Sequence, residues 1–343
     1  MLHELDCLPR GLLSLDATEL VYHLDGPALI HLPGRQTAPL FVSVLMHGNE
    51  TVGWEAIRRL LKRYDGGQDL PRAVSLFIGN ISAAAQGLRR LPGQPDYNRV
   101  WPGEEESHTP EHAMMQQVVA IMRQRQPFAS VDMHNNTGIN PHYACVNRLD
   151  CRFLHLANLF SRTVVYFLRP KGVQSMAMAD LCPSVTLECG KVGQAHGVEH
   201  ALEYLEACLH LAEHPVHPLA AQDIDLFHTV AQAKVRETVS FSFTQDESDI
   251  VFAPDIDHMN FRELPSGTSL GSLNVNDSQL LDVRDESGRD VADRYFVVED
   301  GQLCLARPVM PSMLTTDENV IHQDCLCYLM ERYDSHLHDA DAV

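Results

Sequence analysis

The stretch FVSVLMHGNE, residues 41–50, decides the fold class of this chain. Its first six residues are mostly apolar and β-branched, which is typical of a buried strand. The polar turn HGNE ends that strand at once. Residues 51–64 then carry apolar side chains at the spacing of one helix face. A strand that runs directly into a helix is the repeating unit of an α/β fold.

The same alternation continues to about residue 213. Further strand-like runs are residues 74–78 (VSLFI), 129–133 (ASVDM), 163–168 (TVVYFL) and 184–187 (SVTL). Helical patterns cover residues 110–126, with Thr109 as a candidate N-cap and Pro110 as the first helical residue, and roughly residues 197–213. Strands that alternate with helices predict a three-layer α/β/α domain with a mostly parallel central sheet.

The last third of the chain has a different pattern. The segment HPVHP, residues 214–218, breaks the last helix of the first part. Strand-like runs follow at residues 230–243, 249–253 and 295–298, between turns rich in Gly, Pro, Asn and Asp. We therefore predict two domains: a catalytic α/β domain over residues 1–216 and a smaller β-rich C-terminal domain over residues 217–343.

Charge and cysteine content narrow the class of protein. The 343 residues include 26 Lys and Arg against 46 Asp and Glu, a formal net charge of −20, which disfavours nucleic acid and anionic membranes as partners. The nine cysteines form no C-x-x-C motif, and several lie in apolar runs, as in proteins of reducing compartments. A signal-peptide pattern and a long apolar span are both absent from the sequence. We expect a cytoplasmic protein, and a homo-oligomer is compatible with these features.

Metal-competent side chains follow three of the predicted strands. His47 and Glu50 flank the turn after the first strand, Asp132 and His134 lie at the end of another, and Glu188 ends the last one. The carboxyl ends of parallel strands share one edge of a sheet, and ligands bind in the crevice beyond it. We therefore expect the three motifs to meet at one site.

Two histidines and one glutamate form a ligand set of catalytic zinc sites, in which water fills the fourth position. We expect His47, Glu50 and His134 to bind one Zn²⁺ ion in this way. Glu188 is the candidate for a carboxylate that takes a proton from the water and passes it to a leaving group.

Two of the acidic residues have structural alternatives. Glu188 could form a salt bridge with Lys191 or with an arginine. Asp132 could orient His134 or His47 through a hydrogen bond, or could merely cap a turn.

A loop rich in Pro and Gly, GLRRLPGQPDYNRVWPG at residues 87–103, carries Arg89, Arg90, Asn98 and Arg99. Arginines in a loop are usually surface residues. In a chain of net negative charge, however, such a cluster beside the expected metal site would create a local anion site, because guanidinium groups bind carboxylates bidentately.

Together these motifs resemble those of the succinylglutamate desuccinylase and aspartoacylase family, within the zinc carboxypeptidase-like clan. The resemblance covers about residues 40–200 and is carried by HGNE at 47–50, DYNR at 96–99, Asp-x-His at 132–134 and Glu188 before Gly190. It implies a carboxypeptidase-like α/β domain, one zinc ion on the three ligands above, and hydrolysis of the amide bond of an N-acyl amino acid. It also implies that Glu188 acts as general base and then as general acid.

The resemblance extends to substrate binding. Asn98 and Arg99 would hold a substrate carboxylate. An arginine polarises the scissile carbonyl in the family, but Leu91 stands at the corresponding position here. Arg90 or Arg89 must take this role, and we expect Arg90. A fixed cation there would stabilise the tetrahedral state.

A second departure from the family concerns the amino-acid part of the substrate. Aspartoacylase-like relatives hold the α-carboxylate with an arginine before the catalytic glutamate, whereas residues 172–180, GVQSMAMAD, contain none. Asn135, Asn136 and Tyr143 are candidates for a more neutral substrate pocket. The alternative for these residues is a polar loop with local turn bonds.

The sequence is compatible with three functions. The first is a zinc-dependent amidohydrolase, or deacylase, acting on an N-acyl amino acid or a similar small carboxylate-bearing amide. A zinc carboxypeptidase that trims small or modified peptides would use the same catalytic residues. A zinc-binding regulator without activity is less consistent with Glu188, because binding alone does not need a general base.

Overall fold

The computed structural model describes residues 1–103, 108–244, 247–275 and 280–333. Two compact units make up the chain, and each is built from several segments. The first comprises Met1–Asn135, His142–Tyr166 and Pro170–Asp225, and the second comprises Asn136–Pro141, Phe167–Arg169 and Leu226–Val343. The boundary expected between residues 216 and 217 stays a prediction.

A mixed, mostly parallel sheet forms the centre of the first unit, in the order β1-β2-β4-β3-β5-β8-β6-β7. Its strands are β1 (His3–Leu5), β2 (Ala28–Leu32), β3 (Gly34–Val44), β4 (Leu70–Ile78), β5 (Ala129–Asn136), β6 (Tyr143–Val146), β7 (Thr163–Tyr166) and β8 (Ser184–Lys191). Strand β3 pairs in parallel with both β4 and β5, whereas β2 with β4 and β6 with β8 are antiparallel. The predicted fold class is confirmed.

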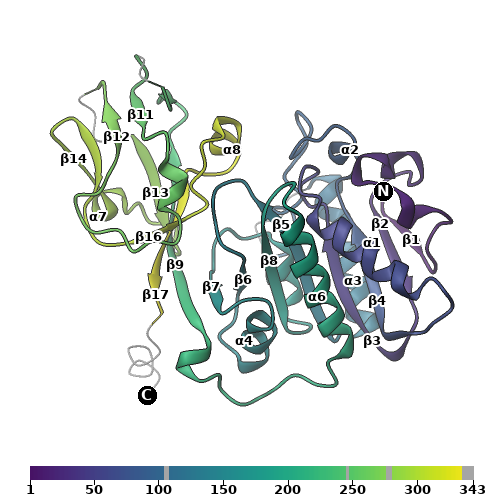
Figure 1. Cartoon of the computed structure of the whole chain (residues 1–343). Coiled ribbons are helices and arrows are strands. Elements are labelled where there is room, and N and C mark those ends of the chain that lie inside the picture. Colours follow the sequence, from purple (N-terminus) through teal and green to yellow (C-terminus); the bar gives the residue numbers. More distant parts are fainter. Residues whose placement is uncertain (104–107, 245–246, 276–279, 334–343) are drawn as a thin grey trace. The chain divides into compact units, whose positions relative to one another are not determined.

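Helices cover both faces of this sheet (Figure 1), with α1 and α6 side by side on one face and α3 on the other. The helices are α1 (Val52–Tyr64), α2 (Ile81–Ala84), α3 (Pro110–Arg125), α4 (Cys151–Asn158), α5 (Gln174–Met178) and α6 (Ala195–His210). Arg59 of α1 and Glu199 of α6 form an ion pair at 2.6 Å. No helix within the described residues is long and apolar enough to cross a lipid bilayer.

Local sequence explains where these elements begin and end. Helix α3 begins at Pro110, and the hydroxyl of Thr109 accepts a hydrogen bond from the backbone N–H of His112, as its predicted N-cap role requires. Strand β3 ends two residues earlier than expected, at Val44, because Leu45 adopts a left-handed conformation with φ of 57°.

The second unit is rich in strands. Strand β9 (Asp225–Val235) pairs antiparallel with β13 (Leu281–Asp285) and β17 (Cys327–Arg332), and β17 pairs with β16 (Met310–Ser312). A separate sheet has the order β10-β11-β12-β15-β14. Its strands are β10 (Phe241–Ser242), β11 (Ile250–Phe252), β12 (Ser269–Leu273), β15 (Gln302–Leu305) and β14 (Phe296–Glu299). The remaining helices of the unit, α7 (Ala292–Tyr295) and α8 (Glu318–Gln323), are short.

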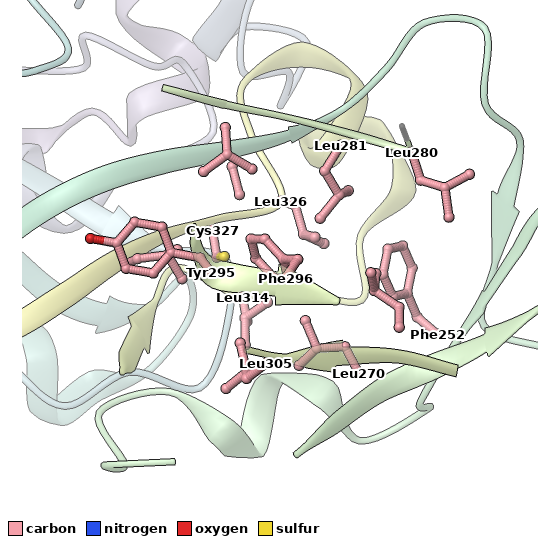
Figure 2. Packing of buried hydrophobic residues seen from close by; sticks show 14 of the residues in the cluster. Phe252, Leu270, Leu280, Leu281, Tyr295, Phe296, Leu305, Leu314, Leu326 and Cys327 are labelled. Carbon is pink, nitrogen blue, oxygen red and sulfur yellow. The ribbon is translucent and has the colours of Figure 1, made fainter. Parts of the chain in front are cut away.

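One hydrophobic core holds the second unit together (Figure 2). Phe252, Leu270 and Phe296 from the separate sheet are buried in the same cluster as Leu281 and Cys327 from the strands around β9. The strand predicted over residues 230–243 is wrong in extent, because a turn between Arg236 and Val239 divides it into β9 and β10.

Candidate active site

The turn between β3 and α1 positions two of the three predicted metal ligands. After the left-handed residue Leu45, the chain turns through His47, Gly48 and Glu50 before α1 begins. A Cβ atom at Gly48 would lie 2.2 Å from the backbone nitrogen of Ala84 in α2. Glycine is therefore needed here for the close approach of two backbones. Both His47 and Glu50 are buried.

The structure brings His47, Glu50 and His134 together. Nδ1 of His47 lies 2.8 Å from Oε1 of Glu50, and Nδ1 of His134 lies 2.7 Å from Oε2 of the same carboxylate. One ligand atom from each residue lies within 4.8 Å of the other two. Within the described residues, this is the one group of three or more His, Cys, Asp or Glu side chains that could hold a metal ion in this way.

Each histidine places its other ring nitrogen against a carboxylate. Nε2 of His134 lies 2.9 Å from Oδ2 of Asp132, and Nε2 of His47 lies 3.0 Å from Oδ1 of Asp96. The hydroxyl of Ser43 donates to Oδ1 of Asp132 at 2.6 Å. Such contacts fix the orientation of a ligating imidazole and leave Nδ1 for the metal. Of the two alternatives for Asp132, the structure therefore has the one in which it orients His134.

The charges around Glu50 keep its carboxylate ionised. Burial alone would raise the pKa of Glu50, but the neighbouring His47 and His134 outweigh it and hold that pKa well below its ordinary value. Burial likewise opposes a charged His134, yet Asp132 and Glu50 raise the pKa of His134 well above its ordinary value. Two imidazole nitrogens and one ionised carboxylate form a donor set that suits Zn²⁺.

Arg89, rather than the expected Arg90, reaches the ligand group. Nη1 of Arg89 lies 3.3 Å from Oε1 of Glu50, and Nη2 lies 3.4 Å from Oδ2 of Asp96. Nη1 of Arg90 instead donates to the backbone oxygen of Gln94. The position of Arg89 has a local cause. Its backbone oxygen accepts a hydrogen bond from the N–H of Gly48, which holds Arg89 beside the turn that carries His47 and Glu50.

Residues 96–99 lie against the same group. The backbone N–H of Asn98 donates to Oδ1 of Asp96 at 2.8 Å, and Nδ2 of Asn98 lies 3.3 Å from Nε2 of His134. Oδ1 of Asn98 is buried and has no hydrogen-bond partner among the described residues. Arg99 donates from Nη1 to the backbone oxygen of Asn98 at 2.8 Å. Sequence reasoning gave Asp96 no role of its own, although its place in the DYNR motif was a usable signal.

Glu188 lies on β8, opposite Tyr143 of β6 in the antiparallel ladder. Its Oε2 atom is buried and has no hydrogen-bond partner among the described residues. Burial is the main cause that raises the pKa of Glu188 to about 8, and the charges of Glu50 and Asp132 add to it. The carboxyl group is thus suited to hold a proton near neutral pH.

The three residues expected to form a neutral pocket lie in different surroundings. Tyr143 is buried and shares a strand pair with Glu188. Asn135 is buried, and both polar atoms of its carboxamide bind backbone groups. Asn136 is buried and belongs to the second unit.

Comparison with known proteins decides the family. Residues 37–211 match the family model described as the succinylglutamate desuccinylase/aspartoacylase catalytic domain. The chain belongs to this family. Membership in the desuccinylase/aspartoacylase family indicates a deacylase, or amidohydrolase, of the aspartoacylase type. A comparison with curated proteins finds no match.

Solved structures of the desuccinylase/aspartoacylase type share the fold of this chain. The succinylglutamate desuccinylase from Vibrio cholerae aligns with a TM-score of 0.60 at 14% identity, over 95% of this chain and 98% of that one. The succinylglutamate desuccinylase/aspartoacylase from Rhodobacter sphaeroides gives 0.54 at 17% identity, over 88% of each chain. Murine aminoacylase 3 gives 0.52 at 15% identity, over 87% of this chain and 96% of that one.

Proposed function

We propose that this protein is a zinc-dependent amidohydrolase that cleaves the amide bond of an N-acyl amino acid. The observation that carries the proposal is the buried group of His47, Glu50 and His134, with Glu188 on a neighbouring strand of the same sheet. Binding alone would not require a buried carboxyl group with an oxygen, Oε2, that has no hydrogen-bond partner among the described residues. A general acid and base does require one that can exchange a proton.

The proposed zinc ligands are His47, Glu50 and His134, and their geometry supports the assignment. Both histidines direct Nδ1 toward Glu50, while Asp96 and Asp132 occupy the opposite ring nitrogens. When bound, the zinc ion would act as a Lewis acid and lower the pKa of a water molecule to about 7.

The proposed proton path runs through Glu188. Its carboxylate takes a proton from the attacking water and later donates it to the leaving nitrogen, so that the amide is cleaved to a free acid and an amine. A pKa of about 8 supports both steps, because a group titrating near neutral pH can accept a proton and then release it. We propose Arg89 as the cation beside the developing oxyanion, since its guanidinium group lies next to Glu50.

We propose that Asn98 and Arg99 bind the carboxylate of the substrate. Oδ1 of Asn98 is buried without a partner among the described residues, and its Nδ2 atom is close to His134. Tyr143 and Asn136 remain proposed members of a neutral pocket. A small amide that carries one carboxylate is the substrate class that this set of residues suits.

A metal-loaded activity screen over N-acyl amino acids and dipeptides tests the proposal. We expect N-acyl amino acids to be hydrolysed and the chain to hold one zinc ion. The Glu188→Gln variant should keep the metal and lose about 10²-fold to 10⁴-fold in kcat, the usual contribution of a general acid and base. The His134→Ala variant should lose the metal, as measured by elemental analysis.

Two other outcomes would identify a different function. Faster hydrolysis of dipeptides than of every N-acyl amino acid would indicate the zinc carboxypeptidase. Stoichiometric zinc without hydrolysis of any amide would indicate the non-catalytic regulator. Full zinc content in folded His47→Ala and His134→Ala proteins would show that the ligand assignment is wrong.

A further inference from the structure

The side chain of Asn135 joins a helix and a strand that border the site. Asn135 follows His134 in β5 and is 5% exposed. Its Oδ1 atom accepts a hydrogen bond from the backbone N–H of Val52 at 3.1 Å, and its Nδ2 atom donates to the backbone oxygen of Gly190 at 2.9 Å. One carboxamide thus links the start of α1 to the end of β8.

The backbone of Asn135 contributes a third bond. Its N–H donates to Oε2 of Glu50 at 3.2 Å, the same oxygen that lies 2.7 Å from Nδ1 of His134. The residue is therefore in direct contact with the proposed ligand Glu50 through its main chain and with β8 through its side chain.

Each partner of the carboxamide lies close to a proposed catalytic or metal-binding residue. Val52 is the first residue of α1 and follows Glu50 by two positions, and helix N–H groups in the first turn have no partner within the helix. Gly190 follows Glu188 by two positions and has a φ of 78°. The bond to Gly190 therefore holds β8 where the chain leaves the sheet.

The chemistry of the two partners specifies asparagine. Val52 offers a donor and Gly190 offers an acceptor, so the bridging side chain must accept on one side and donate on the other. A carboxylate could accept from Val52 but could not donate to Gly190. A leucine of similar size could do neither. Because both polar atoms of Asn135 are already bonded to backbone, the substrate-binding role expected from the sequence is less consistent with this geometry.

We propose that Asn135 is a positioning residue that fixes Glu188 relative to the ligand group of His47, Glu50 and His134. The inference rests on the proposed function, because it assigns Asn135 to the geometry of that reaction. A general base acts only within a narrow range of distances, and a displacement of about 1 Å can cost roughly 10²-fold in rate. Loss of the bridge should therefore lower kcat and leave KM nearly unchanged.

The test uses two variants of the full chain, Asn135→Asp and Asn135→Leu. Hydrogen–deuterium exchange of the metal-free protein should be faster at residues 189–194 in both variants, since both lose the donor to Gly190. Exchange at residues 52–55 should be faster in Asn135→Leu alone, because aspartate still accepts from Val52. With zinc and a substrate, kcat should fall about tenfold to a hundredfold.

Asn260→Asp is the matched control. Asn260 is also buried and bridges backbone groups, accepting from the N–H of Leu314 and donating to the oxygens of Asp257 and Leu314. It lies in the second unit. The Asn260→Asp protein should lose thermal stability but keep normal exchange at residues 189–194 and normal kcat.

Several results would overturn the proposal. A raised KM with an unchanged kcat would make Asn135 a substrate ligand. Unchanged hydrogen–deuterium exchange at residues 189–194 in both variants would show that the Asn135 side chain does not position the end of β8. If the wild-type chain hydrolyses no N-acyl amino acid, the proposed function fails, and exchange still decides whether the bridge positions β8. If Asn135→Leu does not fold, the nearly isosteric Asn135→Asp carries the test.

Discussion

The carboxylate of Glu50 is shared by three cationic or potentially cationic side chains. His47 and Arg89 lie at Oε1, and His134 lies at Oε2. A bound dication would have to share these oxygens with Arg89. Removal of the Arg89 guanidinium group should therefore affect amide hydrolysis directly, while all three proposed metal ligands stay in place.

Arg89→Ala and Arg90→Ala form a matched pair of variants. We expect Arg89→Ala to lower kcat by about 10²-fold to 10³-fold, the cost of removing one group that stabilises an oxyanion. Arg90→Ala should leave kcat close to that of the wild type, since Arg90 binds the backbone of its own loop. Steady-state kinetics on the best amide substrate measure both. A larger loss in Arg90→Ala than in Arg89→Ala would restore the assignment expected from the sequence.

Glu188→Gln should change how the stability of the metal-free protein depends on pH. The folded chain raises the pKa of Glu188 from 4.5 to about 8. Folding then favours the protonated form, so the stabilisation is complete below about pH 4.5 and is lost as the pH rises through about 8. We expect the Tm of the wild type to fall relative to that of Glu188→Gln over this range, measured with a chelator present. Parallel Tm curves for the two proteins would contradict the shift.

The proximity of the candidate residues, rather than their roles, could be predicted from position along a strand. His47 and Glu50 follow β3, whereas His134 and Glu188 lie in the second halves of β5 and β8. Because the carboxyl ends of parallel strands share one edge of a sheet, their proximity could be expected from the sequence. Arg89 could not be told from Arg90, because the conformation of a loop rich in Pro and Gly leaves no periodic signal. The bridging role of Asn135 depends on backbone groups of Val52 and Gly190, which are remote in sequence.

The turn between β3 and α1 connects the site to the packing of whole elements. Gly48 lets this turn approach α2 at a distance that no side chain allows. Its neighbours His47 and Glu50 are proposed metal ligands. If a larger residue replaced Gly48, any backbone shift that relieved its clash with α2 would therefore also move the proposed metal ligands.

Gly48→Ala should destabilise the fold and weaken metal binding together. The added Cβ atom meets the backbone of Ala83 and Ala84, which cannot rotate away, so we expect a loss of about 1–3 kcal/mol in the free energy of unfolding. Gly66→Ala is the control, because a Cβ atom there meets nothing within 4 Å. Denaturant unfolding and a competition assay with a chelator measure the two effects. Wild-type stability in Gly48→Ala would mean that α2 can move aside.

Elements with a clear periodicity could be predicted, and others could not. The helices α1, α3 and α6 follow apolar stripes and caps that are visible in the sequence. The early strands β1 and β2 were missed, since they are short or adjoin β3 closely. The turn between β9 and β10 lies at residues 236–239, RETV, which contain no Gly, Pro, Asn or Asp that would signal a turn.

At the scale of the whole molecule, net charge bears on substrate choice. A chain of net charge −20 repels anions, and residues 172–180 offer no arginine to compensate. We expect N-acetylaspartate and N-succinylglutamate to be poorer substrates than N-acyl amino acids with neutral side chains, by about tenfold to a hundredfold in affinity, the value of one charge-assisted hydrogen bond. Arg99→Ala should raise KM for every carboxylate-bearing substrate.

A matched panel of N-acyl amino acids measures this selectivity. The difference between substrates with two or three carboxylates and N-acyl amino acids with a single carboxylate should shrink at high salt, because salt screens the long-range repulsion. A clear preference for N-succinylglutamate or N-acetylaspartate would contradict the prediction. It would indicate that another cation, such as Arg89, Lys171 or Arg169, fills the position that lacks an arginine.

The interleaving of the two units limits how this protein can be cut and recombined. Asn140 accepts a hydrogen bond from the backbone of Met313, and Arg169 donates to the backbone oxygen of Glu286, so two short segments from the middle of the chain help to build the second unit. A gene fragment that begins at residue 226 lacks both segments. A chimera with a single junction at residue 226 would therefore combine parts of the second unit from two different proteins. Chimeras of homologues should fold only when residues 136–141 and 167–169 are exchanged together with residues 226–343.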